Sequence, residues 1–301
     1  MRVLLSYVTI ILLWSTTPLA IKWSVEGPGF LFGVTSRMTI GTACVLLLLI
    51  VSGQRLAWHR KAIMTYLAVA VQIYGSMLVV YWAAPYIPSG WISVIFGLLP
   101  LMTAILAAIW LKERSLTPGN LLAYILAISG LWIMFGSALQ LGYDAVLGII
   151  GILVATFLQA VSSVWVKRVD GEVPALCQVA GGLLISLPAY LMTWAAFDGR
   201  WPAELSMINL GAMLYLGMIA TPVGFVLYYY LLIRQSATKV ALITLISPVM
   251  ALLLGHAVNH EPLTLKVVTG ISLILSALLI HGLLDWLTSS KQTQLSDNTP
   301  D

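Results

Sequence analysis

The sequence predicts an all-α integral membrane protein, in which ten transmembrane helices form two inverted five-helix repeats. Three observations support this fold class. The 301 residues are 60% hydrophobic and only 9% charged, whereas soluble domains carry about 25% charged residues. Long apolar stretches without Asp, Glu, Lys or Arg fill most of the chain. The second half of the chain also repeats residues of the first half at a constant spacing.

The predicted helices follow from the charge-free windows. About 20 helical residues cross the roughly 30 Å hydrocarbon core of a bilayer. The longest window, residues 62–111, is divided at Pro85 and Pro88, because proline interrupts a continuous helix. The segments are expected to be helices, since lipid offers no water to backbone groups and the alternating pattern of barrel strands is absent. The predicted spans are about residues 3–22, 31–51, 63–84, 89–111, 119–137, 146–166, 175–196, 209–231, 239–258 and 266–286.

The distribution of basic residues predicts that both termini lie in the cytoplasm. When loops are assigned alternately to the two sides, eleven of the 15 Lys and Arg residues fall on one side and three on the other, while Arg37 lies within a span. The side with more basic residues is cytoplasmic by the positive-inside rule. The formal net charge of +4 is therefore a topology signal. We expect a lipid bilayer and a small-molecule substrate as partners and no nucleic acid, and the oligomeric state stays open, with a monomer among the options.

The sequence carries no motif for catalysis, a metal or a cofactor. Cys44 and Cys177 lack the CxxC or Cys/His spacing of a zinc or redox site. His256 and His260 are four residues apart, but the glutamate of an HExxH metal site is missing between them. We therefore expect a protein that is not an enzyme and needs neither a cofactor nor a metal.

An internal repeat divides the chain into two units. A shift of 148 residues pairs Tyr81 with Tyr229, Pro100 with Pro248 and Glu113 with Glu261. Each unit contains an odd number of crossings, so the second unit is expected to be inverted relative to the first. Such halves can open a shared cavity to either side in turn, which predicts alternating access. The predicted units are residues 1–138 and 145–286, followed by a disordered cytoplasmic tail at 287–301.

Similar short motifs, most of them containing proline, recur in the fourth and ninth predicted spans and at their ends. They are residues 87–91 (Ile-Pro-Ser-Gly-Trp), 99–101 (Leu-Pro-Leu), 111–114 (Leu-Lys-Glu-Arg), 246–249 (Ile-Ser-Pro-Val) and 261–264 (Glu-Pro-Leu-Thr). Together they resemble EamA-type members of the drug/metabolite transporter superfamily. This resemblance implies a ten-helix basket with a central cavity, a bacterial-type inner-membrane location, and export or exchange of amino acids and related metabolites. A channel, a lipid scramblase and a proton-coupled metabolite or drug antiporter are the alternative functions.

Polar and aromatic side chains within several spans predict a substrate site. Their mixture of hydroxyl, amide and aromatic groups suits a zwitterion or a modest amphipathic metabolite, although close helix packing explains any single Ser or Thr as well. Pro100 and Pro248 each remove a helical hydrogen bond and are predicted to bend gate helices. The candidate substrate-binding residues are Trp14, Thr17, Gln72, Ser76, Ser93, Phe96, Gln159, Ser162, Thr221, Phe225, Tyr228 and Thr244.

Arg37 is the one permanently charged residue deep within a predicted span. A charge there is costly unless it is paired, hydrated or extended to the lipid headgroups. Because the resemblance places this helix at the periphery, we expect the side chain to reach the external headgroups, with binding of a substrate carboxylate as the alternative. No Asp or Glu lies at mid-membrane, which favours facilitated diffusion or exchange over proton-coupled antiport.

Overall fold

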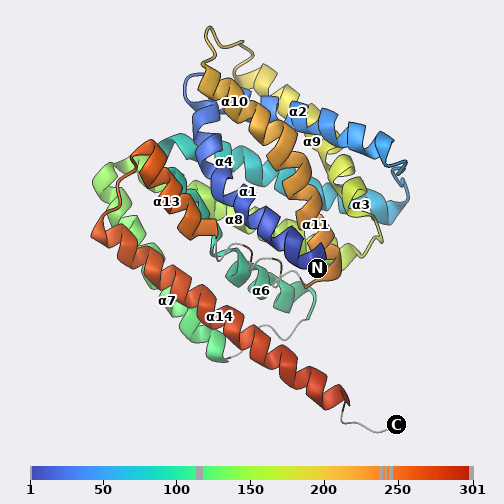
Figure 1. Ribbon diagram of the computed structural model, residues 1–301, viewed down its shortest axis with the longest axis vertical. Coiled ribbons are helices and arrows are strands. Elements are labelled where there is room, and N and C mark those ends of the chain that lie inside the picture. Colours follow the sequence, from blue (N-terminus) through green and yellow to red (C-terminus); the bar gives the residue numbers. More distant parts are fainter. Residues whose placement is uncertain (1, 113–117, 237–239, 241–242, 244–246, 298–301) are drawn as a thin grey trace.

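The computed structural model describes residues 2–112, 118–236, 240, 243 and 247–297, and this part of the chain contains helices and no strand (Figure 1). The first half comprises α1 (Arg2–Val25), α2 (Phe30–Val51), α3 (Arg60–Ala70), α4 (Met77–Ala83), α5 (Ser89–Phe96), α6 (Leu99–Trp110) and α7 (Pro118–Leu141). The second half comprises α8 (Tyr143–Val169), α9 (Ala175–Phe197), α10 (Met207–Tyr215), α11 (Phe225–Arg234), α13 (Ser247–Asn259) and α14 (Leu265–Asp297).

The described helices are those of a membrane protein. Nine helical stretches in this part of the chain are long and apolar enough to cross a bilayer. The shorter apolar helix α13 has 13 residues, and some residues just before it lie outside the described ranges. The predicted all-α membrane fold is therefore confirmed, whereas the crossing expected at 239–258, and with it the total of ten, stays a prediction.

Three of the spans are interrupted within their length. The span that begins with α3 widens into the π-helical turn η1 (Val71–Ser76) before α4 and ends in the 3-10 turn η2 (Ala84–Tyr86). The span from α10 to α11 contains the π-helical segment η3 (Leu216–Gly224). α5 and α6 are separated at residues 97–98, just before Pro100 in the first turn of α6. Short π-helical segments occur frequently at functional sites, and a shift of 148 residues places η1 within η3.

The two halves of the chain interlock. α1 packs against η3 and α13 of the second half, while α8 packs against η1 and α6 of the first half. α2 packs against α9, and α7 lies side by side with α14, at one edge of the molecule in Figure 1. Each half therefore supplies packing partners for the other, and any space between them has walls from both. The inverted orientation of the two repeats stays a prediction.

Glycine allows the close approach of α7 and α14. A Cβ atom at Gly130 would lie 2.4 Å from the carbonyl oxygen of Gly270. A Cβ atom at Gly270 would lie 2.9 Å from the carbonyl oxygen of Gly130. Membrane helices commonly use small residues at such contacts, because backbone packing replaces the hydrophobic effect as the source of association in lipid.

The C-terminal helix is longer than the sequence predicts. α14 runs to Asp297, and its end projects beyond the other helices in Figure 1. Residues 287–297 therefore belong to a helix where the sequence analysis expects a disordered tail. Five of these eleven residues are Leu, Lys or Gln, which favour helix by local propensity.

Candidate transport cavity

A small cavity lies within the helix bundle, with a volume of about 70 Å³. Ligand sites in proteins typically measure roughly 300–1,000 Å³, so its walls must move apart before a metabolite can enter. Its walls come from α1, α2, η1, α4 and α5 of the first half and from α8, α11 and α13 of the second half. The lining residues are Trp14, Thr17, Pro18, Ile21, Arg37, Gln72, Met77, Val80, Ile92, Ser93, Phe96, Gln159, Phe225 and Ser247.

Many of the candidate substrate-binding residues meet at this cavity. Ser76 is an exception, because its buried hydroxyl donates to the carbonyl oxygen of Ala155 at 2.8 Å and so joins η1 to α8. Thr244 lies outside the described residues. Contact of the lining residues with a substrate stays a prediction. Those at the cavity are Trp14, Thr17, Gln72, Ser93, Phe96, Gln159 and Phe225, while Ser162, Thr221 and Tyr228 are not among the lining residues.

Two adjacent tyrosines of α11 connect the cavity walls. The hydroxyl group of Tyr229 donates to Oε1 of Gln72 at 2.5 Å and lies 3.3 Å from Oγ of Ser162. The ring of Tyr228 lies 5.4 Å from the ring of Trp14. These contacts join η1, α8, α11 and α1, so the side chains of Gln72 and Trp14 are held by neighbours behind the cavity surface. Such contacts restrict the orientation of the two side chains before a ligand arrives.

Arg37 lines the cavity, and the expectation that it extends to the lipid headgroups is wrong. The residue is 2% exposed, and its Nε donates to Oγ1 of Thr221 at 2.9 Å. The guanidinium carbon lies 5.9 Å from the ring centroid of Tyr81 and 6.0 Å from that of Phe225. Because α2 packs on η3 and α9, Arg37 is enclosed by protein and is kept away from the membrane surface.

Two glycines on α2 indicate why Arg37 faces inward. A Cβ atom at Gly41 would lie 2.6 Å from Cγ2 of Thr221, and one at Gly33 would lie 2.9 Å from the carbonyl oxygen of Ser24. Residues four positions apart share one face of a helix. Arg37 lies midway between the two glycines, on the face that packs most closely. This spacing is visible in the sequence and would have predicted a buried arginine.

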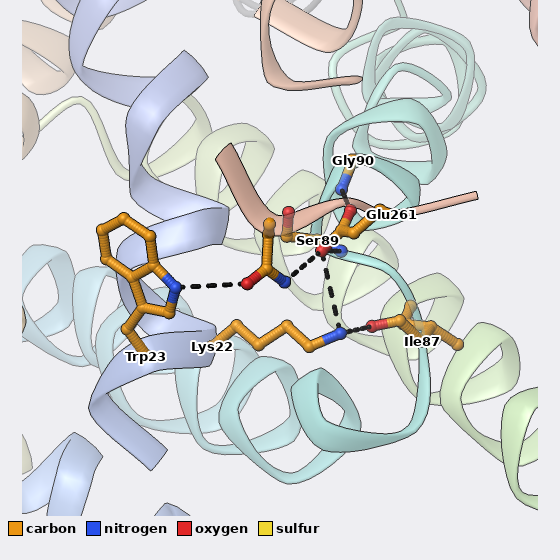
Figure 2. Close-up of polar contacts among 7 residues, drawn as sticks. Lys22, Trp23, Ile87, Ser89, Gly90 and Glu261 are labelled. Atoms are coloured by element: carbon orange, nitrogen blue, oxygen red, sulfur yellow. Dashed lines mark hydrogen bonds and ion pairs between the residues drawn. The ribbon is translucent and has the colours of Figure 1, made fainter. Parts of the chain in front are cut away.

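A buried carboxylate joins the two halves at the end of the bundle that is predicted to be external. Glu261, just after α13, accepts hydrogen bonds from the main-chain N–H groups of Ser89 (2.8 Å) and Gly90 (3.3 Å) at the start of α5. Nζ of Lys22 lies 3.7 Å from Oε1 of the same carboxylate (Figure 2). The first N–H groups of a helix have no partner within the helix, and its positive end attracts an anion. A residue of the second half thus caps a helix of the first.

The neighbours of this carboxylate are bonded in turn. Asn259 donates from Nδ2 to Oε1 of Glu261 at 3.1 Å and accepts from Nε1 of Trp23 at 3.4 Å. Lys22 also donates from Nζ to the carbonyl oxygen of Ile87 at 3.2 Å. We refer to Lys22, Trp23, Asn259 and Glu261 as the external cluster. Within the described residues, no group of three His, Cys, Asp or Glu side chains is placed to hold a metal ion.

The chain folds back at His260 to place Glu261. His260 has a left-handed φ of 52°, which ends α13 and lets the N–H group of Glu261 donate to the carbonyl oxygen of Gly255 at 3.1 Å. A Cβ atom at Gly255 would lie only 2.4 Å from Oε2 of Glu261, and one at Gly90 would lie 2.7 Å from Cδ2 of Leu252. Glycine at both positions therefore leaves room for the carboxylate between α13 and α5.

Comparison with known proteins agrees with this membrane architecture. The family model of the "EamA-like transporter family" matches residues 1–136 and again residues 146–283. An "Uncharacterized transporter" of Archaeoglobus fulgidus is 27% identical over 89% of this chain and 94% of its own length. A "Probable amino-acid metabolite efflux pump" of Salmonella typhimurium is 26% identical over 64% of this chain and 67% of its own length. A solved crystal structure shares the fold, with a TM-score of 0.69, 20% identity, and 94% and 98% of the two chains covered. This multi-pass membrane protein belongs to the EamA-like transporter family.

Proposed function

We propose that the protein is a secondary carrier that exports or exchanges amino acids and related small metabolites by alternating access. The observation that carries this proposal is the cavity, because both halves of the chain line it. A cavity between two halves can be closed at either end by small movements of one half against the other. We place the carrier in an inner membrane of the bacterial type, with both termini in the cytoplasm.

The external cluster supports this mechanism as a latch between the halves. Glu261 holds the start of α5, and α5 also supplies Ile92, Ser93 and Phe96 to the cavity. Separating Glu261 from α5 would therefore free one wall of the cavity at its external end. In an inverted repeat, Glu113 would take the corresponding part at the cytoplasmic end, and this residue lies outside the described residues.

The lining of the cavity supports a small amphipathic substrate. Trp14, Phe96 and Phe225 offer aromatic surface, while Gln72 and Gln159 offer amide groups. Such a wall can bind an apolar side chain and the polar groups of an amino acid at the same time. The name of the Salmonella relative, an amino-acid metabolite efflux pump, points to the same substrate class.

Counterflow in proteoliposomes tests the carrier proposal. Vesicles that contain the purified protein are preloaded with one unlabelled L-amino acid at a time and then exposed to the labelled compound outside. A carrier gives transient, saturable accumulation that depends on preloading, and protein-free vesicles give none. Linear flux at channel rates, without stimulation by preloading, would reject the proposal.

Variants of the cavity wall locate the substrate in the same assay. Trp14→Ala and Gln159→Ala should change the order in which unlabelled amino acids compete for counterflow, because both residues line the cavity. Expression and purification yield should stay close to those of the wild type. Unchanged competition in both variants would remove these residues from the substrate site.

A further inference from the structure

The cavity contains a buried positive charge without an anion. Arg37 is 2% exposed and lines the cavity, and its described hydrogen bond is the one from Nε to Thr221. Its Nη1 is buried and has no hydrogen-bond partner. No described acidic side chain lies within ion-pair distance of Arg37. A buried charge in a membrane is normally paired or hydrated, so this guanidinium is incomplete until an acceptor enters the cavity.

Two amide groups in the same lining also lack a well-placed hydrogen-bond acceptor. Nε2 of Gln72 and Nε2 of Gln159 are both buried and make no hydrogen bond of good geometry, although the Gln159 side chain lies beside the hydroxyl group of Tyr228. Both residues line the cavity. The other end of the Gln72 amide is occupied, because Oε1 accepts from Tyr229. Amide nitrogens and guanidinium nitrogens are donors that cannot accept. Three residues of the wall therefore present donors, and a ligand that accepts hydrogen bonds is the complement of this wall.

The charge and shape of the wall select a carboxylate. A guanidinium binds a carboxylate through two parallel hydrogen bonds, and such charge-assisted bonds are stronger than neutral ones. Most of the remaining lining is apolar or aromatic, with Ile21, Val80 and Ile92 among the lining residues. The wall thus combines one anion-binding region with a surface for a hydrocarbon or aromatic group.

We propose that Arg37 is the carboxylate-binding residue of the cavity, assisted by Gln72 and Gln159. The substrate then carries a free carboxylate and an apolar or aromatic side chain, and its carboxylate supplies the anion that the protein lacks at this site. This inference rests on the proposed carrier function for its physiological meaning, but binding can be measured separately from transport.

The test compares ligands that differ only in the carboxylate. Thermal unfolding of the purified wild-type protein is measured in detergent with leucine and leucinamide, phenylalanine and phenylalaninamide, and methionine and methioninamide. At least one free acid should stabilise the protein at a concentration tenfold or more below that of its amide. Equal stabilisation by acid and amide, stabilisation by inorganic phosphate to the same degree, or no stabilisation by any of the acids would overturn the proposal.

Variants test whether the preference for the free acid over its amide depends on Arg37. Arg37→Gln should abolish the difference between acid and amide, and Arg37→Lys should keep part of it because the charge remains. Arg200→Gln removes an exposed arginine outside the cavity and should keep the wild-type preference. Retention of the full preference by Arg37→Gln would contradict the assignment.

Two further measurements keep the test decisive if Arg37→Gln does not fold. The wild-type comparison of acids with amides needs no variant. Thr221→Val keeps the charge and removes the partner of Nε, so it should weaken binding of the acid severalfold and leave binding of the amide unchanged. A preference for the free acid without counterflow would support the Arg37 assignment and reject the carrier function. Equal counterflow of acid and amide would support the carrier function and reject the Arg37 assignment.

Discussion

The external cluster and the cavity wall both contain buried charge, but only the first contains its own counter-ion among the described residues. Lys22 and Glu261 lie 3.7 Å apart, and main-chain N–H groups bond to the same carboxylate. Arg37, in contrast, has an unpaired Nη1 and no described acidic neighbour at ion-pair distance. Buried polar groups that are satisfied within the fold stabilise it, whereas unsatisfied ones are expected where function requires them. The comparison assigns a structural latch to one region and a ligand site to the other.

The largest expected effect is the loss of the latch. Glu261→Ala removes the acceptor for two N–H groups of α5 and leaves Lys22 without its anion. Breaking a buried pair in this way should lower the free energy of unfolding by about 3 kcal/mol. Chemical unfolding in mixed micelles measures this change. Glu204→Ala, at an exposed position, is the matched control, and equal losses in the two variants would show that the capping bonds contribute nothing.

A smaller effect is expected from filling the space around the latch. Gly255→Ala would place a methyl group 2.4 Å from Oε2 of Glu261, and overpacking of this kind costs about 1–3 kcal/mol. Gly211→Ala is the control, because a Cβ atom there meets no atom within 4 Å. Its better helix propensity should stabilise the protein by up to about 1 kcal/mol. The same unfolding assay separates the two, and a loss of stability in both variants would contradict the close packing described for Gly255.

The smallest changes in stability are expected from polar side chains around the cavity. Their size should depend on whether the side chain makes a hydrogen bond within the protein. Tyr229→Phe leaves Oε1 of Gln72 without its donor and should cost about 1 kcal/mol. Gln159→Leu removes an amide nitrogen that lies beside the Tyr228 hydroxyl group but makes no hydrogen bond of good geometry, so its cost should stay below about 0.5 kcal/mol. The half-saturating substrate concentration in counterflow should nevertheless rise about tenfold in Gln159→Leu, as expected for one lost hydrogen bond. A stability loss in Gln159→Leu equal to that in Tyr229→Phe would assign Gln159 to packing alone.

Much of the fold could be predicted from the sequence because hydropathy reports directly on burial in lipid. The charge-free windows place most spans within a few residues of the observed helices, and Pro85 and Pro88 mark a real division between spans. The π-helical turn η1 could not be predicted, since its sequence is compatible with an ordinary α-helix. In η3, by contrast, Pro222 is a local signal for an interruption of the helix. η1 packs against α8 and η3 against α2, and this packing is a property of the tertiary structure.

Several residues that line the cavity could be named from the sequence, whereas the contacts between them could not. Trp14, Gln72 and Gln159 line the cavity as expected from their position within spans. The expectation for Arg37 is wrong, because it rests on a peripheral position for this helix, whereas Gly33 and Gly41 on the same helix face allow close packing there. Contacts between segments far apart in sequence, such as Glu261 with the start of α5, follow from the fold and have no local sequence signal.

Side-specific labelling of the cavity tests the central claim most directly. A cysteine is introduced at Ser93, which lines the cavity, after replacement of Cys44 and Cys177 by alanine. Membrane-impermeant maleimide is then applied from each side of oriented vesicles, with and without Glu261→Gln. Opening of the latch should accelerate labelling from the external side and slow it from the cytoplasmic side. Acceleration from both sides, as in a channel or a loosened fold, or no change from either side, would contradict a cavity that faces one compartment at a time.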